Sequence, residues 1–497
     1  MLVHQLIYQG KDDAVAFRDK ENVTYRQFQE MVEFYRDYLY YQGVRPGQTV
    51  GLFSRNSAEF VYSYMAIISL GAIVVPLNFQ LTLREIAYII NDAKIGFLIT
   101  MTLLDFSSEL DNQGEVVQLV IPDFSNELSR GASFKAPKLA DDFDKNHPCA
   151  IIYTSGTTGN PKGALLTHGN LVSNAQAFEA VLNVRESDVV LCVLPMYHCF
   201  SWTCSILNSL LAGASIVIMS AFMPKETLAA IKEYAVTVMY GVPPIYNLLL
   251  RIGTNADLAG VKLFVSGGAS LPQMVAEQFF QKFGNKIIEG YGLSEASPVV
   301  MLNPPDKTKY CSIGKPLPGL AVKVVNQEGE MLPPGKVGEL VVKGPSVMKE
   351  YFNLPLDTAR AISGGWLHTG DLAYQDDEGY YFIVDRLKDM IIVNGENVYP
   401  REIEEILYAY PGVVEASVVG VSDNLRGQAV CAYIVLEEGQ NLDKKALKDY
   451  LQVNLAAYKI PRDFIQVSDL PKNNTGKILK RVLLERIANT DNNDEVG

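Results

Sequence analysis

The sequence predicts an α/β fold with a large N-terminal domain of two mainly parallel, helix-covered sheets, a small β-rich subdomain and a small C-terminal α+β domain. Apolar residues alternate between strand and helix spacings up to Val265, which is typical of parallel sheets covered on both faces. Short strands separated by turn-forming residues follow at residues 312–351. After Asp385 the chain restarts with a run of charges, which predicts a separate unit.

Local signals place the elements of the large domain. Thr24 with Gln27, and Thr82 with Glu85, form the capping-box pattern, which predicts that a helix begins after each threonine. The first of these helices has a buried stripe at helical spacing, made of Phe28, Val32, Tyr35 and Leu39. Strands are expected in the apolar runs 50–53, 95–100, 189–193, 215–219, 236–240 and 261–265.

The β-rich subdomain is expected at about residues 312–385, where LAVKVV and GELVVKG are separated by PLPG, NQEGE and LPPGK. Pro400 suits the first position of the next helix, whose expected buried stripe is Ile403, Ile406, Leu407 and Tyr410. Strands at 413–421 and 430–436 and a helix at 443–456 complete the tail. We therefore predict an N-terminal domain at residues 1–386 and a C-terminal domain at residues 387–497.

Composition limits the class of protein. The 497 residues are 48% hydrophobic and 20% charged, which is typical of a globular protein of about three folding units. The net charge of −13 disfavours nucleic acid as a partner. Six cysteines show neither a zinc spacing nor a disulfide framework, and no signal peptide or transmembrane stretch is found, so we expect a cytoplasmic protein.

The most informative stretch is YTSGTTGNPKG at residues 153–163, which follows a short apolar run. Gly156 and Gly159 let the backbone approach an anion closely, and Lys162 adds a positive charge. Hydroxyl donors are supplied by Thr154, Ser155, Thr157 and Thr158. The spacing differs from that of the common P-loop. Composition therefore predicts a phosphate-binding loop, with a flexible surface turn as the alternative.

Four further motifs follow in order: YGLSE at 291–295, TGD at 369–371, VDRLKDMIIVNGENVYPREIE from Val384, and PKNNTGK ending at Lys477. With the loop at 153–163, the chain resembles the adenylate-forming superfamily of acyl- and aryl-CoA synthetases, peptide-synthetase adenylation domains and firefly-type luciferases. It is most similar to bacterial fatty acyl-CoA ligases. The resemblance covers nearly the whole chain and implies that ATP, Mg²⁺ and coenzyme A are used and that the C-terminal domain is mobile.

The resemblance also implies an ATP site. Tyr291 would stack on adenine, and Glu295 would hold the Mg²⁺ that bridges the triphosphate oxygens. Asp371 would bind the ribose hydroxyls, with Arg386 at the same edge. The other nucleotide-binding positions would be Thr154, Ser155, Gly156, Thr157, Thr158, Gly159, Lys162, Gly268, Ala269, Gly290, Gly292, Ser294 and Lys477. Taken singly, Glu295 could be a helix-cap charge, and Asp371 with Arg386 a surface pair.

Lys477 has an electrostatic role in this family. A carboxylate must attack the α-phosphate of ATP, and an ammonium between the two anions offsets their repulsion. The C-terminal domain then rotates about a hinge that matches Lys388, and the loop of Gly395 forms a wall of the coenzyme A tunnel. Without the resemblance, PKNNTGK and GENVYP would be interpreted as exposed turns.

On the acyl side, His198 matches a histidine that in related ligases lies against the substrate carboxylate, and it completes a predicted catalytic set with Lys162 and Lys477. A core histidine is the alternative. Apolar residues of the helix expected after His198, the small residues at 267–269 and the stretch 298–302 could line a hydrophobic slot. The lack of an aspartate at 197–205 disfavours an α-amino acid substrate.

The predicted function is that of an ATP-dependent acyl-CoA ligase, which forms acyl-AMP and pyrophosphate and then the CoA thioester. A medium- or long-chain fatty acid is the favoured substrate. An aryl acid of the coumarate or succinylbenzoate type, and a carrier protein as acceptor in place of coenzyme A, are the alternatives. A non-catalytic sensor is disfavoured because all the catalytic positions are present. Peripheral membrane contact and the oligomeric state stay open.

Overall fold

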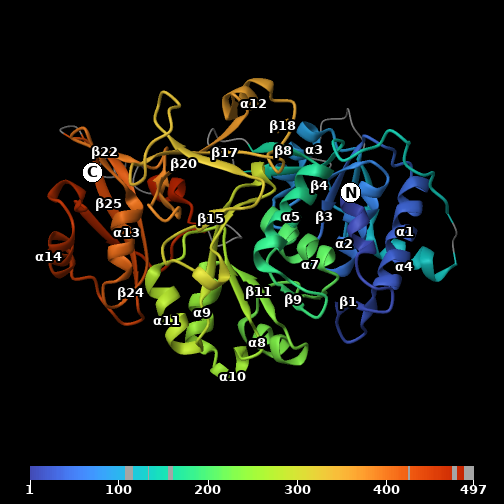
Figure 1. Cartoon of the computed structure of the whole chain (residues 1–497), viewed down its shortest axis with the longest axis horizontal. Coiled ribbons are helices and arrows are strands. Elements are labelled where there is room, and N and C mark those ends of the chain that lie inside the picture. The colour runs from blue at the N-terminus through green and yellow to red at the C-terminus, as the bar shows by residue number, and fades with distance from the viewer. Residues whose placement is uncertain (107–115, 132–133, 155–160, 424–425, 473–477, 486–497) are drawn as a thin grey trace.

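The computed structural model describes residues 1–106, 116–131, 134–154, 161–423, 426–472 and 478–485. These residues form two large sheets, a small antiparallel sheet and a separate C-terminal sheet (Figure 1). In that view the chain passes from the blue N-terminal elements on the right to the orange and red C-terminal elements on the left. The predicted fold class is confirmed.

The first large sheet has the strand order β15-β14-β13-β12-β11-β9-β10-β1-β2. Neighbours from β13 to β1 pair in parallel, and the strands at both ends pair antiparallel. The bounds are β1 (Val15–Arg18), β2 (Val23–Thr24), β9 (Val189–Cys192), β10 (Ser215–Ile218), β11 (Val238–Gly241), β12 (Leu263–Ser266), β13 (Ile287–Gly292), β14 (Val299–Leu302) and β15 (Lys315–Pro316). The parallel strands are almost wholly apolar, as both faces are covered.

The second large sheet has the order β18-β8-β7-β4-β3-β5-β6, parallel from β7 to β6 and antiparallel at β8 and β18. Its strands are β3 (Thr49–Phe53), β4 (Ile73–Pro76), β5 (Phe97–Thr100), β6 (Val117–Val120), β7 (Pro148–Thr154), β8 (Lys162–Thr167) and β18 (Glu350–Tyr351). Helix α5 (His168–Leu182) contacts β8 of this sheet and β14 of the other, and so joins the two.

Both predicted capping boxes are confirmed. The Thr24 side chain accepts from the Gln27 N–H at the start of α1 (Tyr25–Tyr41), and Thr82 accepts from Glu85 at the start of α3 (Leu83–Ala93). The remaining helices before the C-terminal sheet are η1 (Val3–Tyr8), α2 (Ala58–Ser69), α4 (Ile121–Ser129), α6 (Cys199–Ser201), η2 (Trp202–Leu207), α7 (Asn208–Ala212), α8 (Pro224–Glu233), α9 (Pro243–Ile252), α10 (Asn255–Leu258), α11 (Gln273–Phe283), η3 (Ser294–Ala296), η4 (Pro305–Lys307) and α12 (Pro355–Ala361).

The small antiparallel sheet contains β16 (Ala321–Val325), β17 (Gly338–Lys343), β19 (Ile362–Ser363), β20 (Trp366–Gln375) and β21 (Tyr381–Arg386). Residues 312–385 are rich in short strands, as expected, but not all of these strands belong to the small sheet. Strand β15 pairs with β14 and strand β18 with β8, so both belong to the large sheets, and α12 interrupts the run of strands. Short strands separated by turns do not reveal which sheet each one joins, because pairing partners lie far away in sequence.

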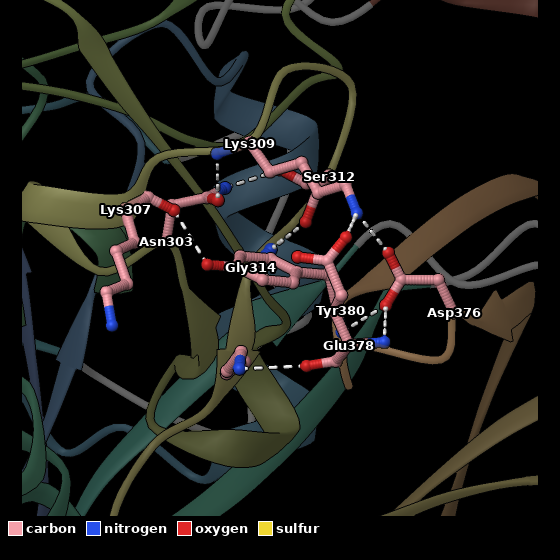
Figure 2. Close-up of polar contacts among 9 residues, drawn as sticks. Asn303, Lys307, Lys309, Ser312, Gly314, Asp376, Glu378 and Tyr380 are labelled. Atoms are coloured by element: carbon pink, nitrogen blue, oxygen red, sulfur yellow. Dashed lines mark hydrogen bonds and ion pairs between the residues drawn. The ribbon is translucent and has the colours of Figure 1, made fainter.

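A polar cluster attaches the loop after β14 to the turn between β20 and β21 (Figure 2). The Lys309 ammonium lies 2.6 Å from a carboxylate oxygen of Asp376 and 2.8 Å from one of Glu378. The Tyr380 hydroxyl donates to the Lys307 carbonyl at 2.7 Å. The small sheet is thereby held against the first large sheet at a fixed position, close to the strand that carries Asp371.

The C-terminal sheet has the order β23-β22-β25-β24, with β26 pairing with β25. Its elements are β22 (Ile391–Val393), β23 (Glu396–Val398), α13 (Pro400–Tyr408), β24 (Val413–Asp423), β25 (Gly427–Leu436), α14 (Lys444–Asn454), η5 (Ala457–Lys459) and β26 (Asp463–Gln466). Ile403 and Leu407 of the expected stripe are buried, whereas Ile406 and Tyr410 are half-buried. The boundary that we predict after Arg386 falls in the turn at 387–389, between the last strand of one sheet and the first of the next.

The six cysteines are unpaired, and five of them are buried. The cytoplasmic location inferred from the cysteine spacing stays a prediction. Among the helices of the described residues, none has the length and apolar character that crossing a membrane would take.

Candidate active site

The expected phosphate-binding loop connects the two strands of an antiparallel hairpin. Thr154, at the end of β7, pairs with Lys162, at the start of β8. Asn160 and the predicted anion-binding positions Ser155, Gly156, Thr157, Thr158 and Gly159 lie outside the described residues. The structure thus fixes the two ends of the loop.

Lys162 has an acidic and an aromatic neighbour. Its ammonium forms an ion pair with the Asp357 carboxylate and lies 5.6 Å from the centre of the Tyr351 ring. The hydrogen bond from Lys162 keeps the pKa of Asp357 below its ordinary value. Sequence reasoning missed both partners. They lie almost 200 positions from Lys162 and carry no spacing signal, and only the pairing of β18 with β8 brings them close.

Glu295 is joined to the same group of residues. It lies in η3, and its carboxylate accepts a hydrogen bond from the Tyr351 hydroxyl at 2.7 Å. Burial and the Glu295 charge raise the pKa of Tyr351, so the phenol stays a donor at neutral pH. Tyr351 therefore bridges the predicted phosphate-binding lysine and the predicted magnesium ligand. We call Lys162, Glu295, Tyr351 and Asp357 the phosphate-side cluster.

Tyr291, Asp371 and Arg386 meet at the edge of the small sheet, and we call them the nucleoside-side cluster. Asp371 on β20 stands opposite Arg386 on β21, and the Arg386 Nε lies 3.4 Å from an Asp371 oxygen. The other Asp371 oxygen accepts from the Tyr291 hydroxyl at 2.5 Å. Asp371 is only 6% exposed, which argues against a plain surface pair. Burial, and then the Asp371 charge, raise the pKa of Tyr291.

Glycines let the strand ends beside Tyr291 come close to their neighbours. Gly268 has a φ of +76°, a conformation that glycine adopts readily. A Cβ on Gly292 would lie 2.1 Å from the Pro298 carbonyl oxygen, and one on Gly290 would lie 2.9 Å from the Leu302 side chain. Ala269 follows Gly268 in the loop after β12. These positions form a close-packed wall at the carboxyl ends of parallel strands, where open α/β sheets bind ligands.

His198 lies beyond the end of β9 and caps the short helix α6, where its Nδ1 accepts from the Phe200 N–H at 3.2 Å. We expected it at the strand end itself, but five residues lie between it and Cys192, where β9 ends. The adjacent Cys199 sulfur lies 3.1 Å from the Ser294 hydroxyl. This contact brings the His198 segment against YGLSE, so the expected acyl and nucleotide regions share a border.

The helix expected after His198 is not a regular α-helix. It is built from α6, the π-helical turn η2 and α7, and π-helical turns occur often at functional sites. Several side chains of this segment are fully buried and polar rather than apolar: Ser201, Thr203, Ser205, Asn208 and Ser209. The expected apolar character thus holds for Trp202, Ile206, Leu207 and Leu210, which are also buried, but the segment as a whole is mixed.

The three residues assigned to domain motion are only partly placed. Lys388 is exposed in the turn after β21, and Gly395 has a φ of +84° in the exposed turn between β22 and β23. Lys477 lies outside the described residues. Their roles as hinge, tunnel wall and catalytic cation stay predictions.

The chemistry of the phosphate-side cluster suits a metal–triphosphate ligand. Glu295 offers a hard carboxylate oxygen, and Lys162 a nearby positive charge. In the part of the chain that the structure describes, no group of three or more His, Cys, Asp or Glu side chains could hold a metal by itself. A Mg²⁺ bound at Glu295 would thus take its remaining ligands from phosphate and water, as this ion commonly does.

Comparison with known families agrees with this geometry. Residues 5–352 match the model of the AMP-binding enzyme family, and residues 402–477 match that of the AMP-binding enzyme C-terminal domain. A long-chain-fatty-acid–CoA ligase of Bacillus subtilis is 36% identical over 90% of this chain and 87% of its own length. A feruloyl-CoA synthase of Amycolatopsis is 35% identical over 92% of both chains.

Among solved structures, ATP-bound MatB from Rhodopseudomonas palustris is 31% identical and superposes with a TM-score of 0.91 over 98% of this chain and 99% of its own. The apo form of the same protein, over the same shares, gives 0.81. The arrangement of this chain is therefore closer to the ATP-bound form.

Proposed function

Because the chain belongs to the AMP-binding enzyme family, we propose that it is an ATP-dependent acid–thiol ligase that converts a carboxylic acid into its CoA thioester. The meeting of Tyr291, Asp371 and Arg386 carries the proposal. It gathers an aromatic ring, a buried carboxylate and a guanidinium from three separate strands, beside a second cluster with a lysine and a carboxylate.

In the first step, an acid carboxylate oxygen attacks the α-phosphorus of ATP. The new acyl–O–P bond forms as the bond to the β-phosphate oxygen breaks, and pyrophosphate leaves. Asp371 and Arg386 hold the ribose, and Tyr291 lies against the adenine. Lys162 and the hairpin loop bind the phosphates, and Lys477 neutralises charge between the two anions. Glu295 would hold Mg²⁺, which would supply further charge neutralisation on the triphosphate.

In the second step, the coenzyme A thiol attacks the acyl carbon, AMP leaves, and the thiol proton passes to solvent or a base. His198 borders the place where the acyl group meets the phosphate, through the contact of Cys199 with Ser294. It aligns the acid carboxylate for attack. In this scheme, the loop of Gly395 forms a wall of the thiol path, and the C-terminal domain turns about Lys388 between the two steps.

The favoured acid is a medium- or long-chain fatty acid, and a relative with that activity in its name matches most of this chain. An aryl acid is the second candidate, supported by the similar identity of the feruloyl-CoA synthase and by one contact. A Cβ on Gly267 would lie 3.0 Å from the Phe200 ring, so this aromatic side chain narrows the space beside the glycine turn. A flat aryl group fits into such a narrow space better than a branched acyl group does.

Acid-dependent release of pyrophosphate tests the proposal. Purified protein is incubated with ATP, Mg²⁺ and a panel of short, medium, long and aryl acids, each with and without coenzyme A. We expect one class of acid to release pyrophosphate and to yield its CoA thioester by mass spectrometry. Pyrophosphate release without thioester would favour a carrier-protein acceptor. No release with any acid would contradict the proposal.

A further inference from the structure

Two adjacent residues at the end of β21 serve opposite parts of the molecule. Arg386 reaches Asp371 and, through it, Tyr291 in the nucleoside-side cluster. Asp385 is 7% exposed and is directed to the C-terminal domain, while its Oδ1 accepts from the Arg386 backbone N–H at 2.7 Å. A shift of one residue is thus transmitted to the other.

The second oxygen of Asp385 caps helix α13. Its Oδ2 accepts from the Arg401 backbone N–H at 2.9 Å. The first N–H groups of a helix have no partner inside the helix, and the residue before α13, Tyr399, supplies no side-chain cap. The cap therefore comes from the other side of the predicted domain boundary, where a carboxylate also suits the positive end of the helix dipole.

The Arg401 side chain strengthens the same junction. Its Nη1 donates to the Ile383 carbonyl of β21 at 2.8 Å, and the side chain is 13% exposed. Glu405, one turn further along α13, accepts from the Gln273 backbone at the start of α11. A helix of the C-terminal domain is thus held to two separate elements of the N-terminal domain by directed polar contacts.

The junction also bears on the segment of Lys477. Lys480, three positions after it, forms an ion pair with Glu404 of α13 at 2.9 Å. The Lys480 charge also acts on Asp385. The orientation of α13 therefore bears on the position of Lys480.

We propose that Asp385 and Arg401 form an interdomain clasp that positions the C-terminal domain for the first half-reaction, the formation of acyl-AMP. The inference rests on the proposed function. The choice of half-reaction follows from the superposition, which is closer to the ATP-bound than to the apo form of the structural neighbour. Asp385 and Arg401 are positioning residues, since neither is placed against substrate.

The test uses the full-length protein with Arg401→Ala, which removes the contact to Ile383, and Asp385→Asn, which weakens the helix cap. Single-turnover experiments measure acyl-AMP formation from acid and ATP, and separately thioester formation from added acyl-AMP and coenzyme A. We expect each variant to slow acyl-AMP formation about tenfold or more, since charged hydrogen bonds are lost, and to leave thioester formation within about twofold. Arg462→Ala is the matched control, because this arginine is 61% exposed and pairs with Asp423 inside the C-terminal domain.

Hydrogen exchange on the same proteins gives a measurement that does not depend on activity. We expect faster exchange in the linker at 387–390 and the first turn of α13 in both variants, and wild-type exchange in Arg462→Ala. Equal losses in the two half-reactions, or unchanged exchange at α13, would overturn the clasp. The wild-type protein could activate no acid while the two variants still exchange faster than the wild type at α13. That result would contradict the proposed function and would support only the role of the clasp in positioning the C-terminal domain.

Discussion

The nucleoside-side cluster and the segment after His198, which contacts the YGLSE motif through Cys199 and Ser294, are built differently. In the cluster, three residues from three strands are joined by direct polar contacts, Tyr291 to Asp371 and Asp371 to Arg386. In the segment, one continuous stretch of helical turns packs small polar and aromatic side chains into the interior. In the proposed function, the residues that bind the nucleotide are thus fixed by direct polar contacts with one another. The choice of acid depends instead on side-chain packing, which one substitution can change.

Among the variants proposed here, Asp371→Ala should cause the largest loss of activity. The variant removes the acceptor of the Tyr291 hydroxyl and the ion-pair partner of the partly exposed Arg386, besides losing the proposed ribose contact. We expect kcat/KM for ATP to fall by about a thousandfold, which corresponds to about 4 kcal/mol. Steady-state pyrophosphate release at varied ATP concentration measures it.

Asp377→Ala is the control for this variant, because Asp377 is exposed in the turn of the same hairpin. A loss of less than tenfold in Asp371→Ala would show that the cluster is structural rather than part of the nucleotide site. The acid preference should stay the same in both proteins, since Asp371 does not border the His198 segment.

Glu289 lies two positions before Tyr291 on β13, is 4% exposed and accepts from the Leu271 N–H at 3.1 Å. Burial raises its pKa to about 7, while Arg401 opposes the rise and Glu405 adds to it. The pKa of Glu289 in the folded protein is above its value in the unfolded chain. The contribution of Glu289 to stability is therefore fully present below pH 4.5 and is lost as the pH rises through about 7. We expect Glu289→Gln to match the wild type at low pH.

At pH 8 the Glu289→Gln protein should be more stable than the wild type by on the order of 3 kcal/mol, since one pKa unit corresponds to about 1.4 kcal/mol. Urea unfolding followed by tryptophan fluorescence at pH 5 and pH 8 measures the difference. Glu328→Gln, an exposed carboxylate in a turn, serves as the control. If the wild type and Glu289→Gln were equally stable at pH 8, Glu289 would not ionise in the protein interior.

Much of this arrangement could be predicted from the sequence, because it rests on local signals. The Thr24 and Thr82 caps and the parallel strands follow from capping boxes and apolar runs, and the placing of Asp371 and Arg386 at one edge follows from the family motifs. Tyr351 and Asp357 could not be found, since they meet Lys162 across almost 200 positions. Arg401 lies inside a quoted motif, but no local spacing signals its contacts with Ile383 and Asp385. The π-helical turn after His198 was also missed, as apolar spacing does not separate it from an α-helix.

Phe200→Ala sharpens the acyl side of the comparison. The Phe200 ring packs against Gly267, so its removal opens space beside the glycine turn. We expect the ratio of kcat/KM for bulky acids to that for short acids to rise about tenfold, a change typical of a pocket enlarged by one side chain. KM for ATP should stay within about twofold. Gly267→Ala narrows the same space and should shift the ratio in the opposite direction.

The smallest effect is expected from Tyr351→Phe. Tyr351 lies between Lys162 and Glu295, so this variant tests whether these two residues act together. The variant keeps the ring beside Lys162 but removes the hydroxyl that donates to Glu295. Glu295 would then be less well oriented, so the Mg²⁺ concentration for half-maximal activity should rise about threefold, as for one partly exposed hydrogen bond. Magnesium titration of pyrophosphate release measures it, with Tyr374→Phe as the control.

The double variant Tyr351→Phe with Asp357→Asn decides between one unit and two. Asp357 acts on Lys162 and Tyr351 acts on Glu295, so independent contacts would give additive changes in magnesium dependence. Tyr351 lies on β18, Asp357 lies on the helix α12 that follows it, and both contact Lys162. We therefore expect the double variant to differ from the sum by about twofold. Strict additivity would mean that lysine and carboxylate bind the triphosphate separately, and that the charges on this side are less interlocked than those around Asp371.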